Sequence, residues 1–245
     1  MSARVTLATS LRVLMQLRRD PRTIALIIGV PILLVTLLRF VFDDQELVFD
    51  RIGGPMLGIF PFISMFVVTS VTMLRERVTG TLERLMTMPL AKLDLLVGYA
   101  LAFALVAVVQ ATAVSLVAFG LLDLHVVGSH VAIVALAVSN AILGMSLGLF
   151  ASAFARSEFQ AVQFMPAIVF PQLLLCGLIV PRERMAGALE LASDFLPLTY
   201  AYDALARVTI GRGLGRWFVL DLVVTLGTTL LALALGALTL RRRTP

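Results

Sequence analysis

The sequence contains very few of the residues that carry thiol, metal-binding or phosphate-binding chemistry. Cys176 is the single cysteine among 245 residues, so the chain can form neither an internal disulfide nor a site with several thiolate ligands. The two histidines, His125 and His130, are too few for most zinc sites. Lys92 is the single lysine and Leu93 follows it, whereas a phosphate-binding P-loop ends in Lys followed by Ser or Thr. These 245 residues therefore contain no complete P-loop, and we expect the chain to bind no cofactor and no metal.

Charged residues are also scarce. They make up 14% of the chain, whereas 60% of the residues are apolar and the mean hydropathy is +1.00. Soluble domains typically contain about 25% charged and about 45–50% apolar residues. The surplus of apolar residues needs an apolar solvent, and a chain in lipid must satisfy its backbone hydrogen bonds internally. The composition therefore predicts an all-α membrane protein.

Uncharged stretches long enough to cross a bilayer occur six times. A crossing helix needs about 20 residues at about 1.5 Å each. The predicted spans are residues 23–42, 55–74, 95–122, 131–154, 160–181 and 217–240. Pro166 and Pro171 lie inside the fifth of these, and proline removes a hydrogen bond and bends a helix. Gly144 and Gly148 in the fourth span match the small-xxx-small pattern of close helix packing.

The distribution of arginine and lysine predicts the orientation of these spans. If the N-terminus lies in the cytoplasm, 13 of the 20 basic residues fall in cytoplasmic segments and seven in outer segments. Short cytoplasmic segments hold the excess of basic residues in membrane proteins. We therefore expect both termini in the cytoplasm, and no removable signal peptide. The high ratio of Arg to Lys is typical of a GC-rich bacterial genome, so we expect the bacterial inner membrane.

Two segments are too polar or too short to cross the bilayer. Residues 5–19 predict an amphipathic helix with leucines on one face and arginines opposite, either lying in the membrane surface or serving only as a positive flank. Residues 182–204 hold short apolar stretches that end at Pro197, which predicts an outer cap or a re-entrant hairpin.

The segment between the second and third spans, residues 75–92, is the most informative part of the sequence. It is too charged to span, yet Leu82, Leu85 and Met86 keep helical spacing. Gly80 permits a change of direction before this short helix, and Pro89 stops it. A charged amphipathic elbow at the cytoplasmic surface suits the transfer of force from a soluble partner, although a solvated loop explains the same pattern.

Three motifs resemble those of one transporter family. The run Glu76-Arg77-x-x-Gly80-Thr81-Leu82-Glu83-x-Leu85-x-x-x-Pro89-Leu90 resembles the signature loop of the membrane subunits of ATP-binding-cassette (ABC) type-2 exporters. Residues 177–182, Gly-Leu-Ile-Val-Pro-Arg, resemble the exit from the family's fifth span. Residues 196–205 resemble its motif before the sixth span. The resemblance covers essentially the whole chain.

The resemblance implies an architecture and a set of partners. Family members pair two six-span subunits with two nucleotide-binding subunits, which bind the ATP and Mg²⁺. It implies a homodimer or related heterodimer of permease subunits in membrane lipid, with no role for nucleic acid. Residues 5–19 would be the connecting helix and residues 81–88 the coupling helix. The residues implied in coupling to the ATPase are Glu76, Arg77, Gly80, Thr81, Leu82, Glu83, Leu85 and Pro89. A purely structural role, pairing with Arg77 or Arg84, is the alternative for the two glutamates.

The substrate path is less well marked. Phe62, Phe66 and Thr69 share a face of the second span, and Gln163 and Phe170 share a face of the fifth. The family's cavity is usually formed by these two spans, so the resemblance implies that the five residues line it. Polar residues inside spans either line a cavity or join helices by hydrogen bonds, and both roles are open for the amides Gln110, Asn140, Gln163 and Gln172.

We expect a permease subunit for amphiphilic drugs, antibiotics or lipid-like compounds. The alternative is export of polysaccharide or lipid-linked glycan, but one Trp and three Tyr offer few surfaces for sugar stacking. An intramembrane enzyme would need carboxylate pairs or Ser and His clusters at membrane depth. Both histidines fall in a predicted outer loop and Asp221 is the lone carboxylate near a span, which argues against an enzyme.

Overall fold

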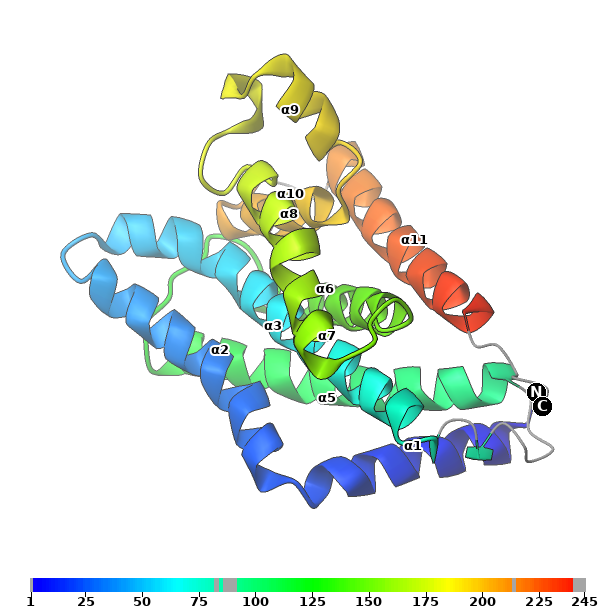
Figure 1. Cartoon of the computed structure of the whole chain (residues 1–245). Helices are drawn as coiled ribbons and strands as arrows, with labels where there is room; N and C mark the ends of the chain where they lie inside the picture. The colour runs from blue at the N-terminus through cyan, green and yellow to red at the C-terminus, as the bar shows by residue number, and fades with distance from the viewer. Residues whose placement is uncertain (1, 82–83, 86–91, 213–214, 240–245) are drawn as a thin grey trace.

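The computed structural model describes residues 2–81, 84–85, 92–212 and 215–239, and helices make up most of them. No β-strand occurs within these ranges. The long helices pack side by side, with α1 at one end of the molecule and α9 at the other (Figure 1). Residues 82–83 and 86–88 of the predicted coupling helix lie outside the described residues, as do residues 89–91 after it.

Among the described residues, five helices are long and apolar enough to cross a membrane. They are α2 (Pro21–Val41), α3 (Glu46–Val78), α5 (Lys92–Gly120), α6 (His130–Ala151) and α11 (Arg216–Leu238). They agree in position with five of the six predicted spans. The second span is longer than the predicted 55–74: α3 has 33 residues, about 50 Å at 1.5 Å each, so its charged ends extend beyond a hydrocarbon core of about 30 Å.

The predicted span 160–181 is not one continuous α-helix. The chain forms α7 (Glu158–Phe164), a π-helical turn (Met165–Val169) and α8 (Phe170–Leu175), and it leaves the helix before Gly177. Pro166 and Pro171 account for the interruption, because a proline has no N–H to donate and its ring clashes with the preceding turn. The bend expected from the two prolines is therefore present, and the helical part ends at Leu175.

The helix predicted over residues 5–19 is α1 (Ala3–Arg18). Its buried face, Thr6, Thr9, Ser10 and Val13, packs against α5, whereas Leu7, Leu11 and Met15 are exposed. Asp20 then caps α2, accepting hydrogen bonds from the Thr23 backbone N–H at 3.2 Å and hydroxyl at 2.6 Å. These two bonds, the hydroxyl bond first, hold the pKa of Asp20 below its usual value. The sharp bend between α1 and α2 is visible in Figure 1.

The centre of the subunit is the packing of α3 along α6. A Cβ added at Gly144 would lie 2.2 Å from the backbone oxygen of Phe62, and one at Gly148 would lie 2.3 Å from that of Phe66. The two helices can therefore approach this closely only because both positions are glycine. The small-xxx-small prediction for these two glycines is confirmed.

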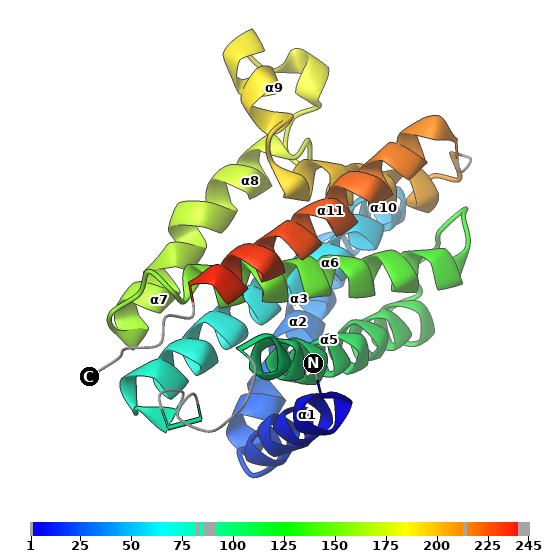
Figure 2. The same ribbon diagram turned by 90° about the vertical axis from the view of Figure 1, so that its right-hand side faces the viewer.

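The segment before α11 lies at the end of the molecule away from α1 (Figure 2). Within the predicted hairpin 182–204 the chain forms a 3-10 turn (Arg182–Arg184), α9 (Gly187–Ser193) and the first part of α10 (Pro197–Thr209). Helix α10 packs on α11, α3 and α6, and its buried face includes Leu198, Leu205 and Val208. The predicted hairpin is therefore anchored on three of the long helices.

Candidate coupling site and helix interfaces

A charged cluster joins three helices at the end of the molecule where α1 lies. Nη1 of Arg12, on α1, is 3.4 Å from Oε1 of Glu76, on α3. Nη2 of Arg12 donates a hydrogen bond to the hydroxyl of Tyr99, on α5, and its guanidinium lies 5.5 Å from the centre of the Tyr99 ring. Arg12, Glu76 and Tyr99 are called the α1–α3–α5 cluster below.

The cluster is largely withdrawn from water. Glu76 is 7% exposed and Tyr99 is fully buried, whereas the Arg12 side chain retains 28% exposure. Within the described part of the chain, Oε2 of Glu76 has no hydrogen-bond partner. Removing one partner of a buried ion pair destabilises a protein strongly, because the other charge is left buried without compensation. Loss of either Arg12 or Glu76 should therefore lower the stability of the fold. The pair therefore links α1 to α3.

Close packing holds α1 against α5 beside the cluster. A Cβ at Gly98 would lie 2.6 Å from Cβ of Thr9 and 2.9 Å from the backbone oxygen of Thr6. The backbone N–H of Ser2 donates to Oδ2 of the buried Asp94 over 3.0 Å. These contacts hold α1 at one position along α5.

A second ion pair connects α3 to the interrupted helix. Nε and Nη2 of Arg75 donate to the two carboxylate oxygens of Glu158 at 3.0 and 3.2 Å. The hydrogen bonds from Arg75 lower the pKa of Glu158. Both side chains are more than half exposed, so this pair is weaker than the buried one. It nevertheless ties the start of α7 to the same end of α3 that carries Glu76.

The structure describes five of the eight predicted coupling residues, and Leu82, Glu83 and Pro89 lie outside it. Glu76 is in the cluster, and the adjacent Arg77 has a buried Nε without a partner among the described residues. Gly80 has a φ of +71°, in the left-handed region that favours glycine. The Thr81 hydroxyl is 3.0 Å from that of Thr79, and Leu85 packs on the core. Gly80 thus makes the predicted change of direction.

A small cavity lies next to Glu76. It has a volume of about 270 Å³ and is lined by α1, the start of α2, α3 and Phe103 of α5. Gln16, Asp20, Thr72 and Thr79 contribute polar groups to its wall.

The five predicted pathway residues do not line one cavity in this subunit. Phe62, Phe66 and Thr69 are fully buried in the packing of α3 on α6, where the Thr69 hydroxyl donates to the backbone oxygen of Met65 at 2.7 Å. Gln163 is exposed and Phe170 is 49% exposed. Only these last two are available to another molecule at the surface of the subunit.

The amides inside the spans have different environments. Nε2 of Gln110 donates to the backbone oxygen of Ile27 at 2.8 Å, which joins α5 to α2. Oε1 of Gln172 accepts from the backbone N–H of Leu198 at 3.4 Å, which joins α8 to α10. Gln110 and Gln172 therefore connect helices. Asn140 is buried and neither of its side-chain polar atoms has a partner in the described ranges.

Sequence reasoning missed Arg12, Tyr99 and the Arg75–Glu158 pair. The polar face of residues 5–19 contained Arg12, but nothing local indicates which acid it meets 64 positions later. Tyr99 is a polar group on a buried stretch, and such a tyrosine usually finds a partner for its hydroxyl. That signal could have identified Tyr99.

Residues 4–210 match the family described as ABC-2 type transporter. The chain is 28% identical over 166 residues to the ABC transporter G family member 20 of Dictyostelium discoideum, covering 68% of this chain and 23% of the relative. It is 27% identical over 156 residues to the probable multidrug ABC transporter permease YbhR of Escherichia coli K12, covering 62% and 42%. It is 28% identical over 177 residues to the inner membrane transport permease YhhJ of the same strain, covering 71% and 47%.

The chain thus spans less than half the length of each of these relatives. The family match, however, covers most of the chain and includes the cluster, the Gly80 turn and the helices that carry them. It agrees with the five apolar helices and with the resemblance of residues 76–90. The chain belongs to the ABC-2 type transporter family and is a multi-pass membrane protein.

Proposed function

We propose that this chain is the permease subunit of an exporter that moves amphiphilic drugs, antibiotics or lipid-like compounds out of the cell. ATP, with its Mg²⁺, is hydrolysed on a separate nucleotide-binding subunit present in two copies. A second permease subunit, identical or related, completes the membrane pore. The observation that carries this proposal is the α1–α3–α5 cluster, because it joins a surface helix to two spans through buried polar contacts.

The proposed topology places both termini in the cytoplasm of a bacterium, with the protein in the inner membrane. The segment from α7 to α8 is the sixth crossing in this proposal, since its 7, 5 and 6 helical residues follow one another without a gap. At about 1.5 Å per residue they approach the thickness of a hydrocarbon core. The π turn, which contains Pro166, then acts as a bend within that crossing.

The proposed route of force begins at residues 76–89. The ATPase engages Gly80, Thr81, Leu82, Glu83, Leu85 and Pro89. Its movement reaches Glu76 and Arg77 at the end of α3 and passes through Arg12 to α1. Packed helices have discrete arrangements and move as rigid bodies, so a small displacement here tilts whole spans. The pore then changes from inward-open to outward-open.

The proposed cargo path uses Gln163 and Phe170, which are exposed on the interrupted helix and free to face a second subunit. Phe62, Phe66 and Thr69 do not contact the cargo in this proposal, and instead hold α3 against α6. One relative's name specifies multidrug transport, in keeping with an apolar cargo. The pathway residues identified from sequence therefore divide into a contacting pair and a supporting set.

An export assay tests this proposal. Cells expressing the chain together with an ABC ATPase encoded beside it are loaded with a panel of fluorescent dyes and antibiotics. We expect faster efflux than in cells with either subunit alone, and slower efflux in Glu76→Ala although the subunits still co-purify. Arg156→Gln, in the connection between α6 and α7, is the matched control. Unchanged export in Glu76→Ala would disprove the coupling role, and no efflux of any compound would disprove the cargo class.

A further inference from the structure

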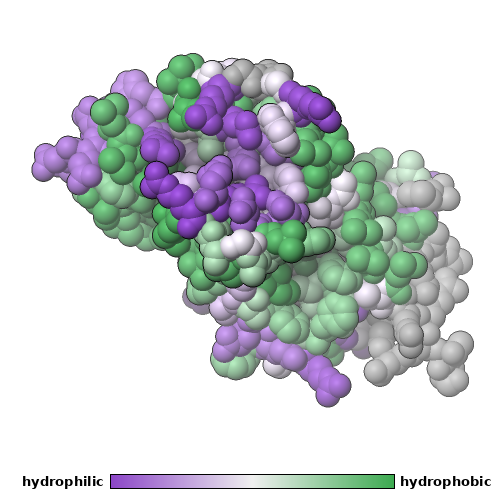
Figure 3. Space-filling view, turned by 90° about the horizontal axis from the view of Figure 1, so that it is seen from above, coloured by the Kyte–Doolittle hydropathy of each residue, from purple (hydrophilic) through white to green (hydrophobic). Residues whose placement is uncertain are grey.

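A cavity lies at the end of the molecule away from α1. It has a volume of about 630 Å³, within the range of about 300–1,000 Å³ typical of small-molecule sites. Its walls come from α3, the segment between α8 and α10, α10 itself and the start of α11. Seen from above, hydrophilic side chains surround a hollow in this face (Figure 3).

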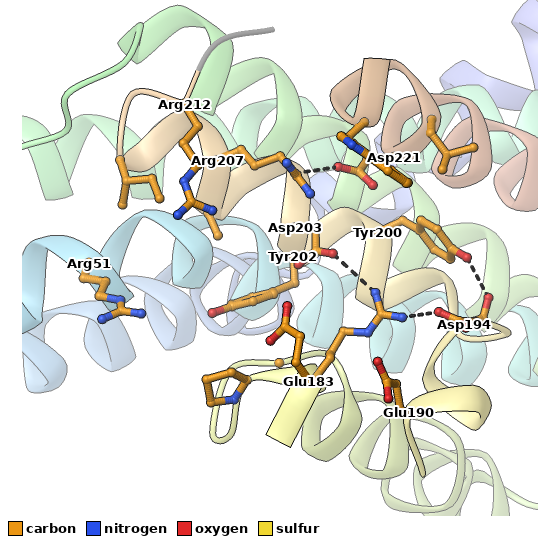
Figure 4. Close-up of a pocket in the computed structure, with 17 residues that line it drawn as sticks. Arg51, Glu183, Glu190, Asp194, Tyr200, Tyr202, Asp203, Arg207, Arg212 and Asp221 are labelled. Carbon is orange, nitrogen blue, oxygen red and sulfur yellow. Dashed lines mark hydrogen bonds and ion pairs between the residues drawn. The ribbon is translucent and has the colours of Figure 1, made fainter. Parts of the chain in front are cut away.

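Ion pairs and hydrogen bonds hold the walls together. Nε of Arg182 donates to the Ser193 hydroxyl at 2.8 Å, and the Arg182 guanidinium also pairs with Asp194 and, at 3.5 Å, with Asp203. Arg207 and Asp221 pair at 3.4 Å and join α10 to α11. Figure 4 shows these pairs across the cavity. The walls are therefore organised before any ligand arrives.

Four charged side chains of the cavity remain after these pairs are formed. Arg51, Arg212, Glu183 and Glu190 line it without an ion-pair partner among the residues that the structure describes. In Figure 4 the two arginines lie at the left, whereas the two glutamates lie toward the centre and the lower right. The cavity thus presents unpaired charges of both signs in different places.

Apolar side chains also line the cavity. They include Ile210, Trp217 and Leu220, and Trp217 is 63% exposed. Trp217 stands in the first turn of α11, one of the long apolar helices. Tryptophan favours the boundary between headgroups and hydrocarbon, so its position suits a cavity at the level of lipid headgroups.

We propose that this cavity binds the headgroup of a zwitterionic amphiphile with a phosphate and an ammonium group, as in phosphatidylethanolamine. Arg51 and Arg212 receive the phosphate, and Glu183 and Glu190 receive the ammonium. The acyl chains leave over Ile210, Trp217 and Leu220. The cavity is lined by four arginines and five carboxylates, so its charges nearly balance. A ligand that carries both a positive and a negative group therefore matches the charges of the cavity better than a ligand with a net charge does. The site is proposed whether or not the same compound is the cargo.

Trp217 supplies the measurement, because it is the single tryptophan of the chain. The purified full chain in detergent is titrated with dihexanoyl phosphatidylethanolamine, and the fluorescence of Trp217 is followed. We expect saturable binding about tenfold tighter than that of dihexanoyl phosphatidylglycerol, a difference of about 1.4 kcal/mol. Equal affinity for the two lipids would overturn the zwitterionic assignment. If soluble phosphoethanolamine bound as tightly as the lipid, the acyl chains would contribute nothing to affinity, and the assignment of an amphiphile would be overturned.

Paired variants test the two ends of the headgroup separately. Arg51→Gln with Arg212→Gln should weaken binding of both lipids about tenfold, whereas Glu183→Gln with Glu190→Gln should weaken only phosphatidylethanolamine and so remove the preference. All four side chains are at least partly exposed, so folding should be retained. Arg156→Gln is the control. Unchanged affinities in both double variants, with native mass spectrometry of retained lipid agreeing, would overturn the proposal.

Discussion

Arg12 on α1 and Glu76 on α3 form an ion pair, with 3.4 Å between Nη1 and Oε1, although 64 positions separate them in the sequence. Tyr99 completes the contact from α5. The sequence resemblance directed attention to Glu76, and the structure supplies its partner. Arg12 thus connects α1 to both α3 and α5, and the contribution of this contact can be measured without knowing the cargo.

A double-mutant cycle should show strong coupling between Arg12 and Glu76. We expect Arg12→Met or Glu76→Gln alone to lower the free energy of unfolding by about 2 kcal/mol, between the values for exposed and for buried pairs. The double variant should lose less than the sum of the single losses, because neither charge is then left unpaired. Thermal unfolding of the purified protein in detergent measures this. If the two losses were additive, the interaction energy between Arg12 and Glu76 would be zero.

Tyr99→Phe isolates the hydroxyl from the ring. The ring stays buried and still faces the Arg12 guanidinium, but the hydrogen bond from Nη2 is lost. We expect a loss of about 1 kcal/mol in stability and a lower cargo-stimulated ATPase rate, with co-purification of the ATPase unchanged. Tyr202→Phe, at the opposite end of the molecule, is the matched control. Full ATPase stimulation in Tyr99→Phe would exclude the hydroxyl from coupling.

Gly144→Ala should strongly destabilise the packing of α3 on α6. The new Cβ would meet a backbone oxygen at 2.2 Å, and backbone cannot turn away as a flexible side chain can. We expect a loss of about 1–3 kcal/mol as the helices separate. Gly227→Ala in α11 is the control, since nothing lies within 4 Å of its Cβ and alanine favours helix. Similar melting temperatures for the two variants would contradict the close approach seen here.

The Arg75–Glu158 pair predicts a pH dependence. Arg75 lowers the pKa of Glu158 below its ordinary value, which is about 4.3. Because the folded-state pKa is lowered, the pair stabilises the protein above the ordinary pKa, and this contribution is lost as pH falls through the folded-state pKa. Both side chains are largely exposed, so the effect should be under about 1 kcal/mol. Comparing the wild type with Glu158→Gln across acidic pH measures it, and parallel curves would contradict it.

The sequence was sufficient for those features that depend on local pattern. Five of the long helices and α1 follow from runs of apolar residues and from periodicity, and the two glycines of α6 follow from their spacing. The two prolines indicate a bend after Glu158, but hydropathy does not predict that the bend takes the form of a π turn between two short helices.

The predicted site residues also divide into features set by local sequence and features set by tertiary packing. Phe62, Phe66 and Thr69 share a helix face as expected, but which neighbour covers that face is decided by α6, far away in the sequence. The partners of Glu76 and Arg75 were likewise not predictable, since ion pairs across helices depend on how the helices cross. Local spacing therefore gives the face of a helix, whereas its role depends on tertiary packing.

Substitutions at Gly80 test the effect of backbone strain alone, because a Cβ added there would meet no neighbouring atoms. Its φ of +71° is costly for residues with a Cβ, yet nothing lies within 4 Å of the position where a Cβ would stand. The backbone N–H of Arg84 donates to the oxygen of Gly80 at 3.0 Å, so this strain acts on the first turn of the predicted coupling helix. We expect Gly80→Val to reduce export more than Gly80→Ala, and Gly80→Asn to reduce it least, because asparagine tolerates the left-handed region best. Export rate per assembled complex is the measurement. Equal export by the valine and asparagine variants would mean that the turn at Gly80 plays no part in coupling.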